Sequence, residues 1–202
     1  MTKDLYATKP QPAGLKYAKR MVTRKNYQGR VIEVTHTLYN ILDITDTDTL
    51  LDIGSGLGYI SKNFSQIVEH IYCCDINQDL INMAEMNCQH RSNMSFHKIT
   101  NEPYLNFLKD SSITKAYAYS VLVHCHTTTI INYLKELERV LKPDGLFLFS
   151  YCIKSDDDNL IQSDKNKIEN TIDKLNFNII KESKCYWKMF ADSVVIELLL
   201  SN

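Results

Sequence analysis

Three of the six glycines in this 202-residue chain, Gly54, Gly56 and Gly58, lie within five residues of one another. They directly follow the run Leu50–Ile53, in the sequence LLDIGSGLG. A short apolar run that ends in a glycine-rich turn is typical of a buried parallel strand entering a tight loop. Residues 59–70 are expected to form the next helix, whose N-terminal N–H groups would face a ligand at the loop. The pattern predicts a ligand site here.

The spacing of the glycines restricts the kind of ligand. A dinucleotide fingerprint requires Gly-x-Gly-x-x-Gly, whereas this chain has Gly-x-Gly-x-Gly and places Tyr59 where the third glycine would stand. Asp52, two residues before the first glycine, suits a ligand with an amino group or a sulfonium better than a pyrophosphate. A second apolar run, Ile71–Cys74, ends in Asp75, whose carboxylate can accept hydrogen bonds from both hydroxyls of a ribose.

These motifs resemble those of the class I S-adenosylmethionine (SAM)-dependent methyltransferases. Residues 119–124 (YSVLVH) resemble the strand and turn that form the floor of the methyl-transfer site, and residues 137–145 (LERVLKPDG) resemble the helix and turn before strand five. The resemblance covers about residues 48–153 and implies SAM as cofactor, with S-adenosylhomocysteine as its product. The cofactor-binding residues that it implies are Asp52, Gly54, Ser55, Gly56, Gly58, Asp75, Ile76, Asn101 and Ser120.

The expected adenine contact departs from the family pattern. Many relatives have an acidic residue after strand three, and by register this position falls near Thr100 or Asn101. Asn101 is expected to bind the adenine amino group, with Glu102 as the alternative.

His124 is the candidate catalytic residue. It begins His124-Cys125-His126, the densest group of titratable side chains at the predicted site, just after the fourth strand. Two roles are open: a general base for a hydroxyl acceptor, because neutral imidazole is poised near physiological pH, or a structural residue packed against the cofactor. The six cysteines form no Cys-x-x-Cys pair, and residues 156–158 (DDD) read as a solvated loop, so no metal site is predicted.

Strands and helices are expected to alternate along the chain. The expected strands are 50–53, 71–74, 94–99, 115–123, 146–153, 178–187 and 193–200, and the expected helices are 31–43, 59–70, 77–89, 127–141 and 165–175. This alternation predicts a three-layer α/β sandwich. Its sheet is expected to be seven-stranded and mostly parallel with the last strand antiparallel, as in the Rossmann-like methyltransferase fold, and ligands bind beyond the carboxyl ends of such strands.

The charge of the chain is unevenly distributed. Residues 1–30 carry eight basic residues and one acidic residue, a net charge of 8 − 1 = +7, whereas residues 31–202 carry 15 − 23 = −8. We therefore divide the chain into a basic N-terminal arm or lid (1–30) and a methyltransferase domain (31–202). The arm is either a solvated leader or a lid that attracts an anionic acceptor such as a phosphorylated or acidic sugar.

Other sequence features narrow the function. The segment after strand four lacks both the Asn/Asp-Pro-Pro-Tyr/Phe and the Pro-Cys patterns, which disfavours nucleic acid as the acceptor. We expect a methyltransferase that acts on a small molecule or a glycan, on oxygen. The alternatives are a non-catalytic regulatory or scaffold domain and an NAD-dependent oxidoreductase; Asp52 and the absent third fingerprint glycine count against the latter.

The location and assembly of the protein are also predicted from simple features. No apolar run approaches 18 residues, and the N-terminus has no signal-peptide core, so a cytoplasmic protein without a membrane span is expected. The chain is short for a separate substrate domain, so either the basic arm or a second subunit of a homodimer is expected to close the site.

Overall fold

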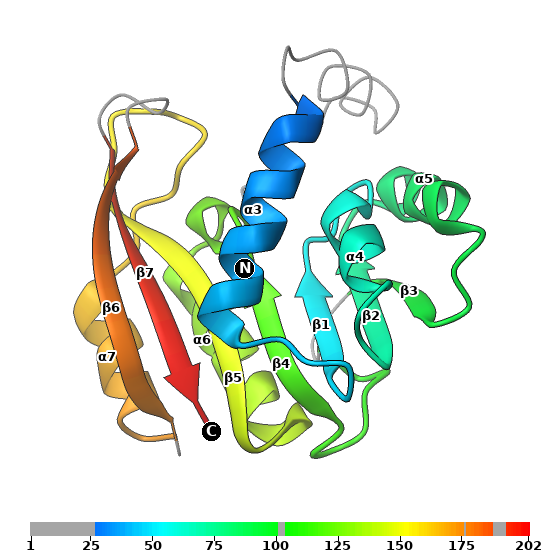
Figure 1. The fold of residues 1–202 in the computed structure, drawn as a ribbon. Helices are drawn as coiled ribbons and strands as arrows, with labels where there is room; N and C mark the ends of the chain where they lie inside the picture. The colour runs from blue at the N-terminus through cyan, green and yellow to red at the C-terminus, as the bar shows by residue number, and fades with distance from the viewer. Residues whose placement is uncertain (1–26, 101–103, 176, 188–192) are drawn as a thin grey trace.

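The computed structural model describes residues 27–100, 104–175, 177–187 and 193–202 (Figure 1). Its strands are β1 (Thr49–Ile53), β2 (His70–Asp75), β3 (Met94–Lys98), β4 (Ile113–Ala118), β5 (Leu141–Lys154), β6 (Asn178–Trp187) and β7 (Ser193–Ser201). They form one sheet in the order β3-β2-β1-β4-β5-β7-β6. β7 is antiparallel to β5 and β6, and the remaining pairs are parallel. The predicted seven-stranded sheet with an antiparallel last strand is confirmed.

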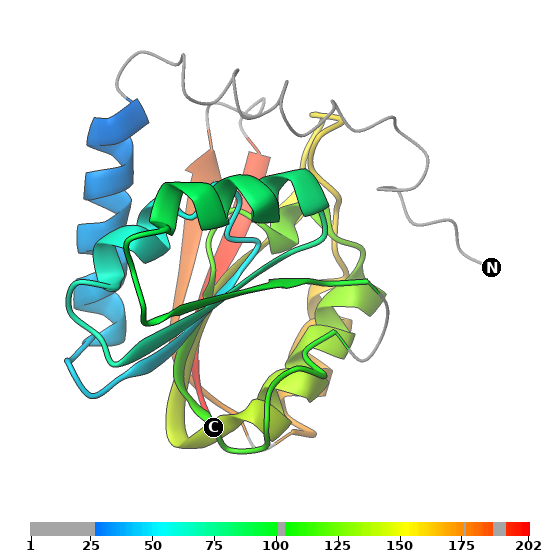
Figure 2. The ribbon, with the colours of Figure 1, turned by 90° about the vertical axis from the view of Figure 1, so that its right-hand side faces the viewer.

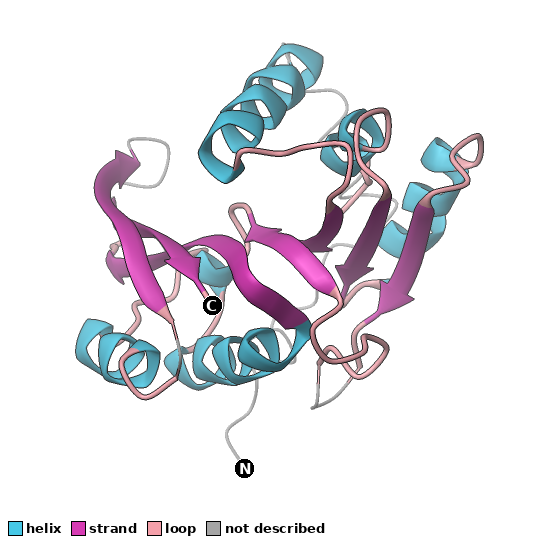
Figure 3. Cartoon of the chain, turned by 60° about the horizontal axis from the view of Figure 1, so that its bottom comes forward, coloured by secondary structure: helices cyan, strands magenta, loops and turns pink. Residues whose placement is uncertain are grey.

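Helices cover both faces of this sheet (Figures 2 and 3). They are α3 (Tyr27–Leu42), α4 (Tyr59–Phe64), α5 (Gln78–Cys88), α6 (Thr127–Val140) and α7 (Lys165–Ile172), with a short 3₁₀ helix, η1 (Leu122–His124). α3 and α4 pack on one face, beside α5, and α6 and α7 pack on the other. The result is the expected three-layer α/β sandwich. None of the described helices is long and apolar enough to cross a membrane.

The pleat of β1 explains how one strand serves both layers. Successive side chains of a strand point to opposite faces. Leu50 lies in the core on the side of α3 and α4, together with Leu38 and Phe64, whereas Leu51 and Ile53 lie in the core under α6 and α7. Because Asp52 alternates in phase with Leu50, its carboxylate is directed to the side of α4, where it meets Ser61.

Side-chain caps mark the start of two helices. The side chain of Asn77 accepts hydrogen bonds from the N–H groups of Asp79 and Leu80, over 2.9 and 3.3 Å, so it is the N-cap of α5 as expected. Asp164 caps α7 in the same way through the N–H of Lys167, over 3.2 Å. These caps fix the start of each helix, which follows the end of a strand.

Two helices are shorter than the sequence pattern predicts. The helix expected over 59–70 ends at Phe64, because the side-chain amide of Asn93 donates to the carbonyl groups of Ser65 and Val68, each over 3.0 Å. This amide satisfies carbonyl groups of the turn between α4 and β2, so the chain leaves the helix there. The helix expected to reach residue 175 ends at Ile172.

The boundaries of β4 and β5 also differ from the prediction. β4 ends at Ala118 rather than at residue 123, because Ser120 adopts a left-handed conformation (φ 59°) and residues 122–124 form η1. β5 begins at Leu141, and its register against β4 shifts between Ile113 and Lys115. The left-handed residue in the expected turn is Asp144 (φ 64°).

The strand order reverses at β1, which is flanked by β2 on one side and by β4 on the other. α4 follows β1 on one face of the sheet, and α6 follows β4 on the opposite face. The two connections therefore diverge beyond the carboxyl ends of β1 and β4, where open α/β sheets bind their ligands. The glycine loop and His124 both lie at this edge.

Candidate active site

The glycine loop adopts a conformation that requires glycine at three points. Gly54, Gly56 and Gly58 have φ angles of 74°, 55° and 74°, all in the left-handed region. The N–H groups of Gly54 and Ser55 both donate to the carbonyl oxygen of Cys74 in β2, over 2.7 and 3.0 Å. These bonds hold the start of the loop against the second strand, so its shape does not depend on a ligand.

The three glycines differ in what surrounds them. A Cβ atom on Gly54 would lie 2.4 Å from Cγ2 of Val121, and one on Gly58 would lie 3.1 Å from Cβ of Ala84. A Cβ atom on Gly56 would meet nothing within 4 Å. Gly54 and Gly58 therefore permit close packing within the protein, whereas Gly56 faces open space that a bound group can enter.

Asp75 ends β2 directly beside this open space. Its Oδ2 accepts a hydrogen bond from the N–H of Gly56, over 3.1 Å, and its Oδ1 accepts one from the N–H of Asn77, over 2.9 Å. Burial raises the pKa of this carboxyl, and the backbone N–H groups of Asn77, Gly56 and Ile76 oppose that rise. The next side chain, Ile76, is 46% exposed although it is apolar.

Asp52 is buried below the loop, and protein groups occupy its carboxylate. Ser61 Oγ donates to Asp52 Oδ2 over 2.5 Å, and the Ser61 hydroxyl also lies 3.1 Å from Tyr117 Oη. The pKa of Asp52 is raised to about 7, first by burial and to a smaller extent by the charge of Asp75, against the opposing effect of these hydroxyls. The sequence suggested Asp52 as a partner for a cationic ligand. In the structure its side chain belongs to an internal hydrogen-bond network.

The hydroxyl group of Ser55, another predicted cofactor contact, has no hydrogen-bond partner within the protein. Its Oγ atom is buried. Since buried hydroxyls are nearly always paired, this atom is suited to a polar group of a ligand. The remaining predicted adenine contact, Asn101, lies outside the described residues, as does most of the basic arm, residues 1–26.

The turn after β4 carries Ser120 and His124 to the same edge of the sheet. Ser120 forms the left-handed corner, and Val121 packs against Gly54 of the glycine loop. η1 follows, closed by the hydrogen bond from His124 N–H to the carbonyl of Val121 over 3.0 Å. The contact between Gly54 and Val121 thus connects the glycine loop to the segment that ends in His124.

His124 is half-buried, and a second loop fixes its ring. The Nδ1 atom of His124 is hydrogen-bonded to the backbone carbonyl oxygen of Asn159, in the loop between β5 and α7. A carbonyl oxygen only accepts, so Nδ1 carries the hydrogen and Nε2 is left as the basic nitrogen. Burial lowers the pKa of His124, while the Asn159 carbonyl and the charge of Asp157 oppose that change, so the ring is neutral near pH 7.

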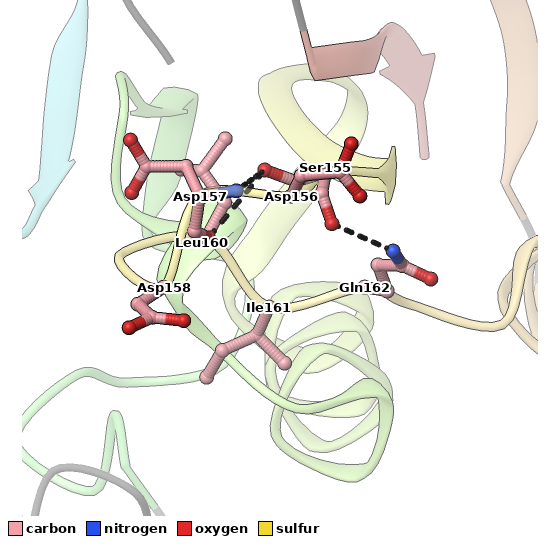
Figure 4. Close-up of a pocket in the computed structure, with 7 residues that line it drawn as sticks. All are labelled: Ser155, Asp156, Asp157, Asp158, Leu160, Ile161 and Gln162. Atoms are coloured by element: carbon pink, nitrogen blue, oxygen red, sulfur yellow. Dashed lines mark hydrogen bonds between the residues drawn. The ribbon is translucent and has the colours of Figure 1, made fainter. Parts of the chain in front are cut away.

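The loop that holds Asn159 carries the three aspartates of residues 156–158. Figure 4 draws the residues of this loop that line a hollow, and a dashed line marks the hydrogen bond from Asp157 N–H to Ser155 Oγ, over 2.9 Å. The hollow has a volume of about 520 Å³. Asp156 and Asp158 are exposed, as expected for a solvated loop, whereas Asp157 is half-buried. Within the described part of the chain, no group of three or more His, Cys, Asp or Glu side chains is placed to hold a metal ion.

Two sets of contacts at this edge could not be read from the sequence. Ser61 lies in the helix after the glycine loop, but nothing in its spacing indicates that its partners are Asp52 and Tyr117. The pattern Asp157-x-Asn159 is typical of an Asx turn, a signal that the sequence does contain. Its connection to His124 spans 35 residues and depends on the fold.

The fold and the glycine loop define a Rossmann-like methyltransferase domain, and comparisons with known proteins agree. Residues 51–149, from β1 into β5, match a family model described as a methyltransferase domain. The protein MJ1252 of Methanocaldococcus jannaschii is 28% identical over 162 residues, which are 78% of this chain and 59% of that protein. The chain therefore spans less than two thirds of the length of this relative.

Two solved structures illustrate the range of this fold. The magnesium protoporphyrin IX methyltransferase ChlM from Synechocystis PCC 6803, with bound S-adenosylhomocysteine, matches with a TM-score of 0.66 and 15% identity, over 88% of this chain and 83% of that one. The [4+2]-cyclase SpnF matches with a TM-score of 0.72 and 14% identity, over 89% and 83%. At such identities a likeness shows the fold alone.

The matched part of the chain, residues 51–149, is therefore similar to a methyltransferase domain, a class of domain whose cofactor is SAM. Three observations of this structure fit that cofactor: the open space at Gly56, the Asp75 carboxylate beside it, and the unpaired hydroxyl of Ser55.

Proposed function

We propose that this protein transfers a methyl group from SAM to a hydroxyl oxygen of a small molecule or a glycan. The observation that carries the cofactor part is the open position at Gly56, whose N–H binds the carboxylate of Asp75. A ligand that enters this space meets an acceptor for its ribose hydroxyls and the free hydroxyl of Ser55. SAM, when bound, supplies a methyl group on a positively charged sulfur.

The remaining predicted cofactor residues take supporting roles in this proposal. Gly54 and Gly58 allow the loop to pack tightly. Ile76, exposed beside Asp75, offers an apolar surface to the adenine ring of the cofactor. Ser120 shapes the corner next to the loop, and Asn101 would bind the adenine amino group. Asp52 supports the start of the following helix from below the loop, through its hydrogen bond from Ser61.

The observation that carries oxygen as the acceptor atom is the hydrogen bond between His124 and the Asn159 carbonyl. An alcohol is a weak nucleophile until a base removes its proton. With Nδ1 donating to the carbonyl, Nε2 of His124 is available to take that proton as the oxygen bonds to the methyl carbon. The sulfur then leaves with the bonding electrons as a neutral thioether, which needs no acid.

The basic arm, residues 1–30, supports the proposal that the methyl acceptor is negatively charged. Its net charge of +7 would attract an anion, whereas the loop beside His124 carries three aspartates and would not. Replacing Lys19, Arg20, Arg24 and Lys25 by serine should therefore raise the KM for such an acceptor and leave SAM affinity unchanged. If the KM of this variant is unaltered at low and high salt, the arm is a solvated leader with no role in binding the acceptor.

A turnover screen tests the proposed function. Purified protein with methyl-labelled SAM is offered pools of cell metabolites and glycans, and labelled product is identified by mass spectrometry. His124→Ala is the matched variant, and it should lower kcat by about 10²–10⁴ with SAM affinity nearly unchanged. Failure of the wild-type protein to bind SAM in calorimetry would overturn the proposal. Unchanged turnover by His124→Ala would rule out His124 as the general base.

The proposed setting is the cytoplasm. Five of the six cysteines, Cys73, Cys74, Cys88, Cys125 and Cys152, are buried thiols outside any disulfide, which suits a reducing compartment. A homodimer that closes the site is proposed as well, and light scattering of the purified protein would measure it.

A further inference from the structure

We propose that Asp157 is a positioning residue for His124: it fixes Asn159, whose carbonyl in turn orients the imidazole. The inference rests on the proposed function, because it assigns how the base of that reaction is held. It concerns a contact between two loops that lie far apart in the sequence, and each link is a hydrogen bond between described atoms.

The first link joins Asp157 to Asn159. Asp157 Oδ1 accepts from the backbone N–H of Asn159 over 2.7 Å and from its side-chain amide over 2.6 Å. Hydrogen bonds to a carboxylate are stronger than those between neutral groups. Two of them on one oxygen hold both the backbone and the side chain of Asn159.

The far side of Asn159 is fixed by burial. Leu160 is only 6% exposed and packs in a cluster with Val123, Cys152 and Val195. The N–H of Ile161 donates to the carbonyl of Val123 over 2.9 Å, one residue before His124 in the chain. The Asn159 carbonyl therefore lies between two anchored points, and its oxygen has little freedom relative to the His124 ring.

The second link determines which nitrogen of His124 is basic. Free histidine favours the tautomer with hydrogen on Nε2, which would place a donor where a base is needed. The Asn159 carbonyl selects the opposite tautomer, because only Nδ1–H can donate to it. When Nε2 takes up the acceptor proton, Nδ1–H remains bonded to the carbonyl, so the imidazolium keeps its place.

The most direct effect of losing Asp157 should therefore be a change in the tautomer of His124. Two-bond ¹H–¹⁵N correlation spectra of ¹⁵N-histidine protein at pH 7.5, without SAM, report the tautomer; the His124→Gln spectrum identifies the signal among the six histidines. In the wild type Nε2 should resonate as an unprotonated nitrogen. In Asp157→Ala the signal should move towards the Nε2–H tautomer.

Two further variants separate positioning from charge. Asp157→Asn keeps an oxygen that can accept from Asn159 N–H but removes the negative charge, so it should retain the wild-type tautomer. Asp156→Ala removes the same charge from an exposed neighbour in the same loop and should have no effect. With an acceptor in hand, kcat should fall about 10–100-fold in Asp157→Ala at unchanged KM, and Asp157→Asn should restore it to within a few-fold.

The outcomes distinguish the inference from the proposed function. A wild-type spectrum with hydrogen on Nε2, or an Asp157→Ala spectrum identical to wild type, overturns the positioning role whatever the enzyme does. A tautomer shift equally large in Asp156→Ala overturns it as well, because charge alone would then explain the shift. If the spectra change as expected but His124→Ala turns over normally, Asp157 positions His124 and the base role fails.

Discussion

The carboxylate of Asp75 accepts a hydrogen bond from the N–H of Gly56, with 3.1 Å between Oδ2 and N. This bond crosses from the end of β2 to the middle of the glycine loop after β1, and Asn77 N–H holds the other carboxylate oxygen over 2.9 Å. The acid is therefore oriented before any ligand arrives, which reduces the ordering cost of binding. The same carboxylate has a raised pKa because it is buried, so a ligand that donates to it also stabilises its charge.

Removing this carboxylate should weaken SAM binding. Asp75→Ala loses both the acceptor for the ribose and the restraint on Gly56, and we expect an affinity lower by roughly 1–3 kcal/mol. Asp75→Asn keeps one acceptor oxygen and should lose less. Isothermal titration calorimetry measures both variants, with circular dichroism as the check of folding. Wild-type affinity in a folded Asp75→Ala protein would remove Asp75 from the site.

The three glycines should respond differently to one added methyl group. Gly54→Ala places Cβ against Val121 in a left-handed residue, so we expect a loss of unfolding free energy of about 2–4 kcal/mol from strain and overpacking. Gly56→Ala meets open space and should cost only about 1–2 kcal/mol, from its backbone conformation. Its main effect should be on SAM affinity, because the methyl group occupies the space proposed for the cofactor.

A second substitution tests the cause of the Gly54 effect. Val121→Ala removes Cγ1 and Cγ2, the two atoms nearest to the new Cβ, at 2.7 and 2.4 Å. The double variant Gly54→Ala/Val121→Ala should therefore lose less unfolding free energy than the sum of the losses in the two single variants. Urea unfolding of the four proteins gives the coupling energy. Additive effects would mean that backbone strain alone destabilises Gly54→Ala.

The sequence predicts the layered fold well because its signals are local. Apolar runs, the N-cap Asn77 and the glycine loop each depend on neighbouring residues, and their positions in the structure agree with the prediction. The errors occur where a distant group decides the outcome. The helix after the loop ends early because Asn93, some 30 residues later, binds the carbonyl groups of Ser65 and Val68 in the turn that follows it. The support of His124 by the β5–α7 loop arises in the same way, from a contact that only the folded chain brings about.

The pH dependence of turnover should report the environment of His124. Burial lowers the pKa of its imidazole, so the ring becomes neutral below the ordinary value near 6.5. If neutral His124 is the base, kcat should rise with pH, and the midpoint of that rise should lie below pH 6.5. The charge of Asp157 opposes the lowering, so in Asp157→Asn the rise should move to still lower pH. His126→Ala serves as the control. A rise centred above pH 6.5 would contradict the base role.

Asp52 should make the protein less stable as the pH rises towards neutrality. Its pKa is raised from 3.8 to about 7 by burial, so between these values the folded chain holds a proton that the unfolded chain has released. The unfolding free energy then falls with pH, by about 1.4 kcal/mol per unit at most, which amounts to about 2–3 kcal/mol between pH 5 and pH 8. Below the unfolded pKa the contribution is complete, and above about pH 7 it is lost.

Asp52→Asn isolates this effect from the other titrating groups, including Asp75, whose raised pKa acts in the same direction. The amide cannot ionise, yet its oxygen can still accept from Ser61 Oγ. Urea unfolding at pH 5 and pH 8 should therefore show a smaller loss of stability in the variant than in the wild type, by about 2–3 kcal/mol. Ser61→Ala is the complementary variant, because it removes a hydrogen bond that favours the charged form of Asp52. The pKa of Asp52 should rise further in this variant, so its unfolding free energy should go on falling to a higher pH than in the wild type. If the stability of Asp52→Asn and of the wild type changes in parallel between pH 5 and pH 8, the buried carboxyl does not titrate in this window.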